Sequence, residues 1–166
     1  MSLAEKLRAV PILAGLTEAQ IEAILGVVTS RRVAADTVIV REGDEGKSLF
    51  ILTEGSVEVT KRLGLGIQMP TEGSREKLLV SLDAPQFFGE MGLLEDTERS
   101  ATITTRGGCE LVEITHENFE RLAELDPLLG YRVLRNIAVV LSSRLRRTDR
   151  DVVKLTMALS LALGIR

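Results

Sequence analysis

The chain has 166 residues, of which 45% are apolar and 27% are charged, so it is long enough for one domain with a hydrophobic core. A net charge of −3 argues against nucleic acid as the main partner, because DNA binding needs a concentrated basic surface. A single cysteine excludes an intramolecular disulfide. No segment approaches the roughly 18 consecutive apolar residues of a membrane helix. We therefore expect a cytoplasmic chain that by itself binds neither DNA nor membrane.

Residues 1–30 are predicted to form helices. Thr17 and Gln20 make a capping-box pair (T-x-x-Q), which marks the start of a helix. The apolar residues that follow recur at i, i+3, i+4 and i+7, as on one face of an amphipathic helix: Ile21, Ile24, Leu25 and Val28. A shorter helical piece, ending near Gly15, is expected before it.

Residues 31–115 have the pattern of a β domain. Short β-like runs separated by turn residues occupy Thr37–Arg41, Ser48–Leu52, Ser56–Arg62, Lys77–Leu82, Ser100–Thr105 and Glu110–Ile114. Many short strands with glycine-rich turns favour a closed or double-sheet barrel. We therefore predict a mainly β (α+β) fold, an antiparallel β-roll or jelly-roll barrel flanked by N-terminal helices and a long C-terminal helix. Residues 64–75 are predicted to form a hairpin loop.

Residues 116–166 are predicted to be helical again. Asp126 and Pro127 provide an N-cap followed by proline at the first helical position. A coiled-coil-like seam with spacings of three and four follows: Leu134, Ile137, Leu141, Leu145, Thr148, Val152, Leu155, Leu159 and Ala162. Because this seam is longer than one barrel edge can cover, we expect a homodimer through the C-terminal helix.

The segment 87–101, FFGEMGLLEDTERSA, carries the strongest functional signal. Gly89 permits an unusual backbone angle, and the helical turn expected after it has free amides that attract an anion. Arg99 can bind the same anion with both arms of its guanidinium, and Ser100 adds a hydroxyl donor. On spacing alone, an ordinary ion pair between Glu90 and Arg99 around a tight turn is an equally good interpretation.

This segment resembles the phosphate-binding cassette of the cyclic nucleotide-binding domain family, F-G-E-x-(A/G)-L-(L/I)-x-x-x-x-R-(S/T/A)-A. That family includes the catabolite activator proteins and the regulatory subunits of protein kinase A. The stretches REGDEGKSLFILTEGSVEV (residues 41–59) and LDAPQFF (residues 82–88) are also similar to the family pattern. The resemblance extends over roughly residues 10–160 and implies one cyclic nucleotide-binding domain, 1–166, with its cassette at 87–101.

The resemblance also implies roles for individual residues. Arg99 would pair with the cyclic phosphate, and Glu90 would accept a hydrogen bond from the ribose 2′-OH. Gly89, with the backbone amides near Gly92 and Leu93, would complete the phosphate cradle. Phe88, Met91 and Ala101 belong to the same cassette and are expected to line the site.

Two positions bear on the base of the nucleotide. Ser100 would bond to the phosphate or to a syn purine, and serine at this position accompanies cAMP receptors, whereas threonine favours cGMP. Thr148 looks aligned with the first residue of a Thr-Ser pair that contacts adenine in catabolite activator proteins, although Asp149 replaces the serine here. The alternative is that Thr148 only sets the register of the helix.

These observations predict a cyclic nucleotide sensor that signals through its C-terminal helix. The ligand expected is cAMP, with cGMP as the alternative, and no cofactor or metal is expected. Enzymatic activity is not expected either, because a lone His116 cannot build a nitrogen-rich metal site and Cys109 has no histidine near it in the sequence. A separate effector protein is the expected partner. The alternatives are the sensory part of a transcription regulator whose DNA-binding domain is absent, and a dimerisation module that binds no ligand.

Overall fold

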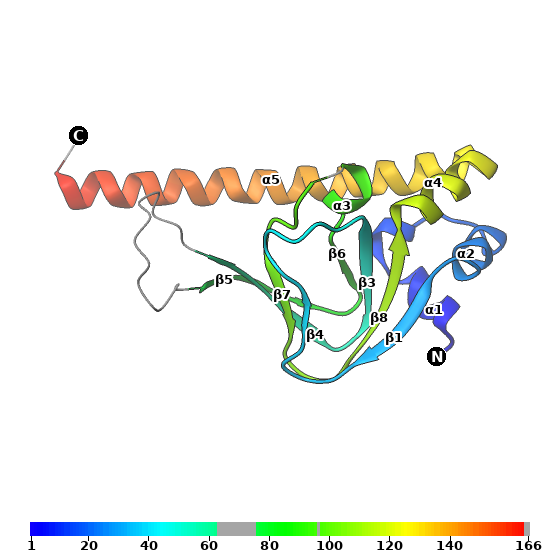
Figure 1. Cartoon of the computed structure of the whole chain (residues 1–166). Coiled ribbons are helices and arrows are strands. Elements are labelled where there is room, and N and C mark those ends of the chain that lie inside the picture. Colours follow the sequence, from blue (N-terminus) through cyan, green and yellow to red (C-terminus); the bar gives the residue numbers. More distant parts are fainter. Residues whose placement is uncertain (63–75, 96, 165–166) are drawn as a thin grey trace.

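The computed structural model describes residues 1–62, 76–95 and 97–164. Two antiparallel sheets of four strands each form a β-roll, and one long helix runs along its side (Figure 1). The predicted mainly β fold with flanking helices is confirmed. The hairpin loop predicted at residues 64–75 lies outside the described residues.

The first sheet has the strand order β1-β8-β3-β6, and the second has the order β2-β7-β4-β5. The strands of the first sheet are β1 (Thr29–Val33), β8 (Cys109–Thr115), β3 (Ser48–Glu54) and β6 (Gln86–Phe88). Those of the second are β2 (Val38–Val40), β7 (Thr102–Thr105), β4 (Ser56–Arg62) and β5 (Glu76–Asp83). The sequence did not predict β1 and β6, because β1 is polar and mostly exposed and β6 has only three residues.

Alternation along β3 divides the hydrophobic core into two parts. Leu49 and Ile51 belong to a cluster formed with the helices, whereas Phe50 and Leu52 belong to a cluster inside the β-roll. Successive side chains of a strand point to opposite faces, so a strand covered on both faces is apolar throughout. This arrangement places Phe50 on the inner face, where the functional site forms.

The helices besides the short one in the cassette are α1 (Leu3–Arg8), the 3₁₀-helix η1 (Pro11–Leu13), α2 (Glu18–Leu25), α4 (His116–Leu125) and α5 (Pro127–Leu163). The predicted capping box is present at α2, where the Thr17 hydroxyl and the Gln20 side chain each accept a backbone N–H of the other residue. Across the described ranges, none of the helices combines the length and apolar character needed to cross a membrane.

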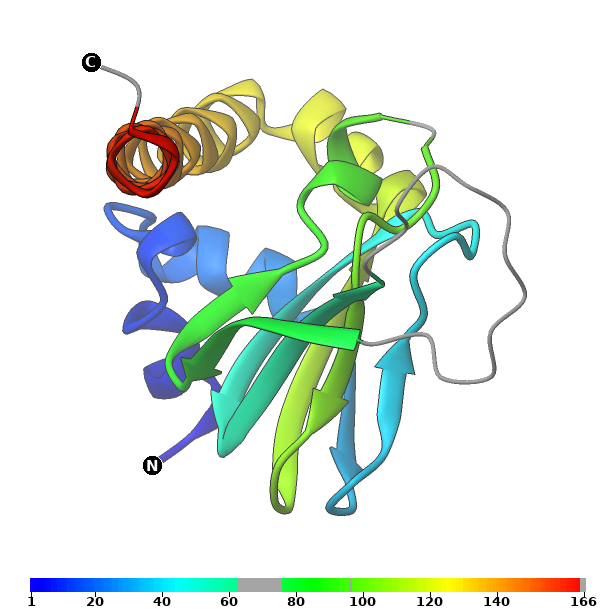
Figure 2. The same ribbon diagram turned by 90° about the vertical axis from the view of Figure 1, so that its left-hand side faces the viewer.

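Helix α5 begins where the sequence predicts. The Asp126 carboxylate accepts the amides of Leu128 and Leu129, and Pro127 occupies the first helical position. The first turns of α5 are buried through Leu129, Val133 and Ile137, and the helix then continues past the cassette to the far end of the molecule (Figures 1 and 2). Of the predicted seam, the described part of the chain buries Ile137 and partly covers Leu141, whereas Leu134 and Leu145 are exposed.

Candidate functional site

The cassette is a sharp turn between β6 and a single helical turn, α3 (Met91–Leu94). Gly89 has φ +77°, a left-handed conformation that favours glycine. A Cβ at Gly89 would lie 2.8 Å from Nη1 of Arg99, and one at Gly92 would lie 2.2 Å from the carbonyl oxygen of Gly46. A Cβ at Gly46 would lie 2.1 Å from Nε of Arg99. These three glycines therefore let the backbone surround the guanidinium closely.

Arg99 is a buried cation held by neutral acceptors. Its side chain donates from Nη1 to the carbonyl oxygen of Ser48 at 2.7 Å and from Nη2 to the Ser48 hydroxyl at 3.0 Å. The residue is 8% exposed, and its guanidinium carbon lies 5.5 Å from the centre of the Phe50 ring. In the part of the chain that the structure describes, Arg99 forms no ion pair with a carboxylate. Burial lowers the pKa of the Arg99 guanidinium, and the nearby Glu113 carboxylate opposes that shift.

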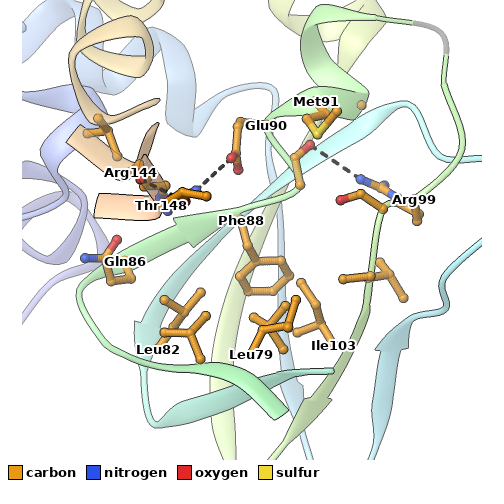
Figure 3. Close-up of a pocket in the computed structure, with 18 of the residues that line it drawn as sticks. Leu79, Leu82, Gln86, Phe88, Glu90, Met91, Arg99, Ile103, Arg144 and Thr148 are labelled. Atoms are coloured by element: carbon orange, nitrogen blue, oxygen red, sulfur yellow. Dashed lines mark hydrogen bonds and ion pairs between the residues drawn. The ribbon is translucent and has the colours of Figure 1, made fainter. Parts of the chain in front are cut away.

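Glu90 is also buried, at 8% exposed, but it does not pair with Arg99. Its Oε1 accepts a hydrogen bond from Nη1 of Arg144 on α5 at 2.7 Å (Figure 3). Arg144 also donates to the carbonyl oxygen of Phe87 at 3.3 Å and lies over the Phe87 ring. The interpretation of Glu90 and Arg99 as a simple ion pair across the turn is therefore wrong, and the actual partner of Glu90 comes from a helix 54 residues further along the chain.

A cavity of about 670 Å³ opens between the cassette, the second sheet and α5. One end is polar and contains Glu90, Arg99 and Ser100. The other end is apolar, and in Figure 3 Leu79, Leu82 and Ile103 lie below the Phe88 ring. A small ligand with one anionic end and one flat apolar end would match this division.

The structure brings most of the predicted site residues together at this cavity. Phe88, Gly89, Glu90, Met91, Gly92, Arg99, Ser100, Ala101 and Thr148 line it, whereas Leu93 is 2% exposed and belongs to the core cluster beneath the helices. Thr148 lies near Arg144 on α5, and its hydroxyl donates to the Arg144 carbonyl oxygen at 3.1 Å. Whether these residues bind a ligand remains a prediction.

The amides of the cassette are only partly available. Those of Gly92 and Leu93 already donate to the carbonyl oxygens of Gly89 and Glu90, both at 3.1 Å. Within the described residues, the amides of Glu90 and Met91 have no acceptor. The amides left free are therefore those at the very start of α3, one or two positions before the ones that the sequence suggested.

Sequence reasoning missed several residues that α5 contributes to the cavity. Besides Arg144 and Thr148, α5 lines it with Val139, Val140, Ser143, Arg147 and Asp151. In the sequence, the arginines at residues 144–150 have the pattern of a solvated surface, because they point in several directions around a helix. The sequence contained no sign of which arginine would turn towards the cassette.

The fold and the site define a β-roll domain that holds a glycine-bordered arginine in a cavity flanked by the long helix α5. The particular family follows from the comparison of sequences: residues 30–126 match the family described as "Cyclic nucleotide-binding domain", and the chain belongs to that family. The resemblance seen in the cassette is thereby confirmed.

Relatives of the chain include regulators of different kinds. The cAMP-activated global transcriptional regulator Vfr of Pseudomonas aeruginosa is 31% identical over 126 residues, covering 74% of this chain and 53% of Vfr. The cGMP-dependent protein kinase, isozyme 1, of Drosophila melanogaster is 34% identical over 117 residues, covering 70% of this chain and 14% of the kinase. The crystal structure of Thermus thermophilus catabolite activator protein superposes with a TM-score of 0.73 at 29% identity, covering 88% of this chain and 63% of that one. The chain spans about half the length of the first curated relatives it matches.

Proposed function

We propose that this chain is a sensor that binds a cyclic nucleotide, with cAMP as its ligand, and does no chemistry on it. The observation that supports this most is Arg99, a buried guanidinium that faces the cavity and has only neutral acceptors around it. Burying a charge is costly unless an opposite charge compensates it. A singly charged cyclic phosphate would supply that charge in the bidentate geometry that arginine favours.

The rest of the cavity suits the other two parts of such a ligand. The second carboxylate oxygen of Glu90 is available for a ribose hydroxyl, since Arg144 occupies only Oε1. The apolar end, with Phe88 and Leu79, would take the purine, and Thr148 would meet its edge from α5. Ser100 and the cAMP-activated relative Vfr favour adenine, while the cGMP-dependent relative makes cGMP the alternative.

The signal would pass from the cassette to the C-terminal helix. The ring Nδ1 of His116, at the start of α4, lies 2.8 Å from the carbonyl oxygen of Leu93 in α3, and Arg144 joins α5 directly to Glu90. Ligand binding would therefore shift the population between two positions of α4 and α5. That shift is limited by the difference in affinity of the nucleotide for the two states.

Titration calorimetry of the purified chain with cAMP, cGMP, a cyclic dinucleotide and 5′-AMP tests the proposal. We expect one cAMP per chain, bound more tightly than cGMP, and clearly weaker binding of 5′-AMP, whose dianionic phosphate lacks the ring. If none of these nucleotides bound at about 1 mM, the sensor proposal would be abandoned in favour of a dimerisation module without ligand.

Replacing Arg144 with glutamine is expected to weaken cAMP binding about tenfold, because Glu90 loses the group that orients it towards the ribose. The loss should be clearly smaller for 2′-deoxy-cAMP, which has no hydroxyl for Glu90 to bind. Arg150→Gln is the matched control, since Arg150 is an exposed arginine on the same helix that does not line the cavity. Equal losses for the two nucleotides would show that Arg144 contributes charge and does not orient Glu90.

Two kinds of signalling protein are compatible with this domain. We propose a homodimer through α5 that acts on a separate effector protein. The second candidate, the sensory part of a transcription regulator, is favoured by the regulator relatives and by the fact that the chain spans about half their length. Pull-down of a partner by the cAMP-loaded chain, compared with the sequence of the full reading frame, distinguishes the two.

A further inference from the structure

Arg99 lines a second cavity, of about 450 Å³, at an open end of the β-roll. This cavity is walled by Phe50 of β3, Arg31 of β1 and Glu113 of β8, none of which lines the larger cavity where the nucleotide is proposed to bind. Three further charged residues border it, namely Asp44, Glu45 and Lys47. Groups at this second cavity can therefore act on Arg99 without contact with the ligand.

The ring of Phe50 organises the charges at this cavity. The guanidinium carbon of Arg99 lies 5.5 Å from the ring centre, and that of Arg31 lies 5.3 Å from it. Glu113 is paired with Phe50 in the register of β3 and β8, and its Oε2 lies 3.8 Å from Nη2 of Arg31. Two cations and one carboxylate thus surround one buried aromatic ring.

The two charges beside Arg99, on Glu113 and Arg31, have different effects on its guanidinium. The Glu113 carboxylate favours the charged guanidinium and so raises the pKa of Arg99 against the effect of burial. Arg31 pairs with the same carboxylate, so its positive charge offsets part of the electrostatic effect of Glu113 on Arg99.

We propose that Glu113 and Arg31 are positioning residues that set the affinity of the phosphate site from behind Arg99, with opposite signs. Glu113 competes with the ligand phosphate for the charge of Arg99, and Arg31 relieves that competition by pairing with Glu113. The proposal depends on the cyclic nucleotide function proposed above, because it assigns the control of affinity at that same site.

Calorimetric titration of cAMP into three variants tests this assignment. Glu113→Gln is expected to tighten binding by about threefold to tenfold and Arg31→Gln to weaken it by a similar factor, since the first removes the charge that competes for Arg99 and the second removes the charge that offsets it. Because Arg31 acts through Glu113, the double variant should bind about as tightly as Glu113→Gln alone. Residues that only supported the fold would weaken binding in both single variants. Arg31→Lys, which keeps the charge, should remain close to wild type.

A matched control pair lies elsewhere on the β-roll. Arg106 and Glu58 form an ion pair at 3.0 Å on the second sheet and line neither cavity, so Arg106→Gln and Glu58→Gln repeat the changes in net charge at a distance. These variants should leave the cAMP affinity unchanged. Circular dichroism and thermal unfolding confirm that each variant is folded, and Arg31, which is 44% exposed, is the safer of the two substitutions.

The outcomes separate the two proposals. A wild-type chain that binds no cyclic nucleotide overturns the sensor function. A wild-type chain that binds cAMP, together with single variants that both weaken binding or both leave it unchanged, overturns the roles of Glu113 and Arg31 alone. If Glu113→Gln does not fold, the two Arg31 variants still test the role of Arg31. Arg31→Gln should lose affinity for cAMP, whereas Arg31→Lys should not.

Discussion

Replacing Arg99 with alanine is expected to weaken cAMP binding by about 2–5 kcal/mol, the cost of leaving a desolvated anion without its charged partner. Among the described residues, Arg99 is the only buried cation, and three glycines leave the backbone space for its guanidinium. The Ser48 carbonyl and hydroxyl hold the side chain in place before any ligand arrives. Titration calorimetry measures the loss, and wild-type affinity in this variant would remove Arg99 from the site.

Two further measurements separate the charge of Arg99 from its geometry. Arg99→Lys keeps the charge but loses the forked donor set, so it should bind cAMP more weakly than wild type while remaining better than alanine. Thermal unfolding without nucleotide reports the structural part of the effect, because removal of the side chain also leaves the Ser48 acceptors without their donor. A variant that loses binding but keeps its unfolding temperature shows that the ligand needs Arg99 more than the fold does.

The cassette could be predicted from the sequence because its function resides in one short segment. Gly89 has the left-handed backbone that its position suggested, and the helical turn after it forms as Met91–Leu94. Glycine and arginine at fixed spacing leave little choice of local structure. The same local logic predicted the caps at Thr17 and Asp126, where side-chain oxygens accept the first amides of a helix.

The partners of the cassette could not be predicted, because they come from distant segments. Arg144 lies in a cluster of arginines that face several directions, and only the path of α5 across the β-roll decides which one meets Glu90. Glu113 and Arg31 belong to polar strand positions that resemble solvated surface in the sequence. They point to the inside of the β-roll because the register of β1, β3 and β8 places them beside Phe50. Tertiary pairing, which local pattern does not encode, determines this part of the site.

Hydrophobic periodicity predicted the long helix but not what covers each part of it. Ile137 is 1% exposed and Leu141 packs partly against the core formed with the helices, so these positions serve the fold of the chain itself. Beyond them the same spacing leads to side chains that are exposed in the described part of the chain. Leu145 is 62% exposed and Leu155 is 70% exposed. A periodic pattern fixes which face of the helix is apolar, whereas the end of the β-roll decides where that face stops being buried.

Leu155→Asp is therefore expected to convert the proposed dimer into a monomer without unfolding the domain. The exposed part of the seam on α5 contains Val152, Leu155 and Leu159, and a continuous apolar stripe of this kind marks a protein interface. In a two-fold dimer each substitution appears twice, so two carboxylates would lose their hydration at one seam. Leu141→Asp is a poorer test, since it would also disturb the core of the monomer.

Sedimentation velocity measures the result, with Met157→Asp as the matched control. Met157 is 62% exposed and lies two positions after Leu155, so the substitution puts the same charge on the opposite face of the helix. We expect a dimer for the wild type and for Met157→Asp, and a monomer for Leu155→Asp. Because Leu145 of the exposed seam lies close to Arg144 and Thr148 in the chain, the monomer should also bind cAMP with altered affinity if α5 transmits the signal between subunits. A dimer that survives Leu155→Asp would mean that the exposed stripe on α5 faces something other than a second copy of this chain.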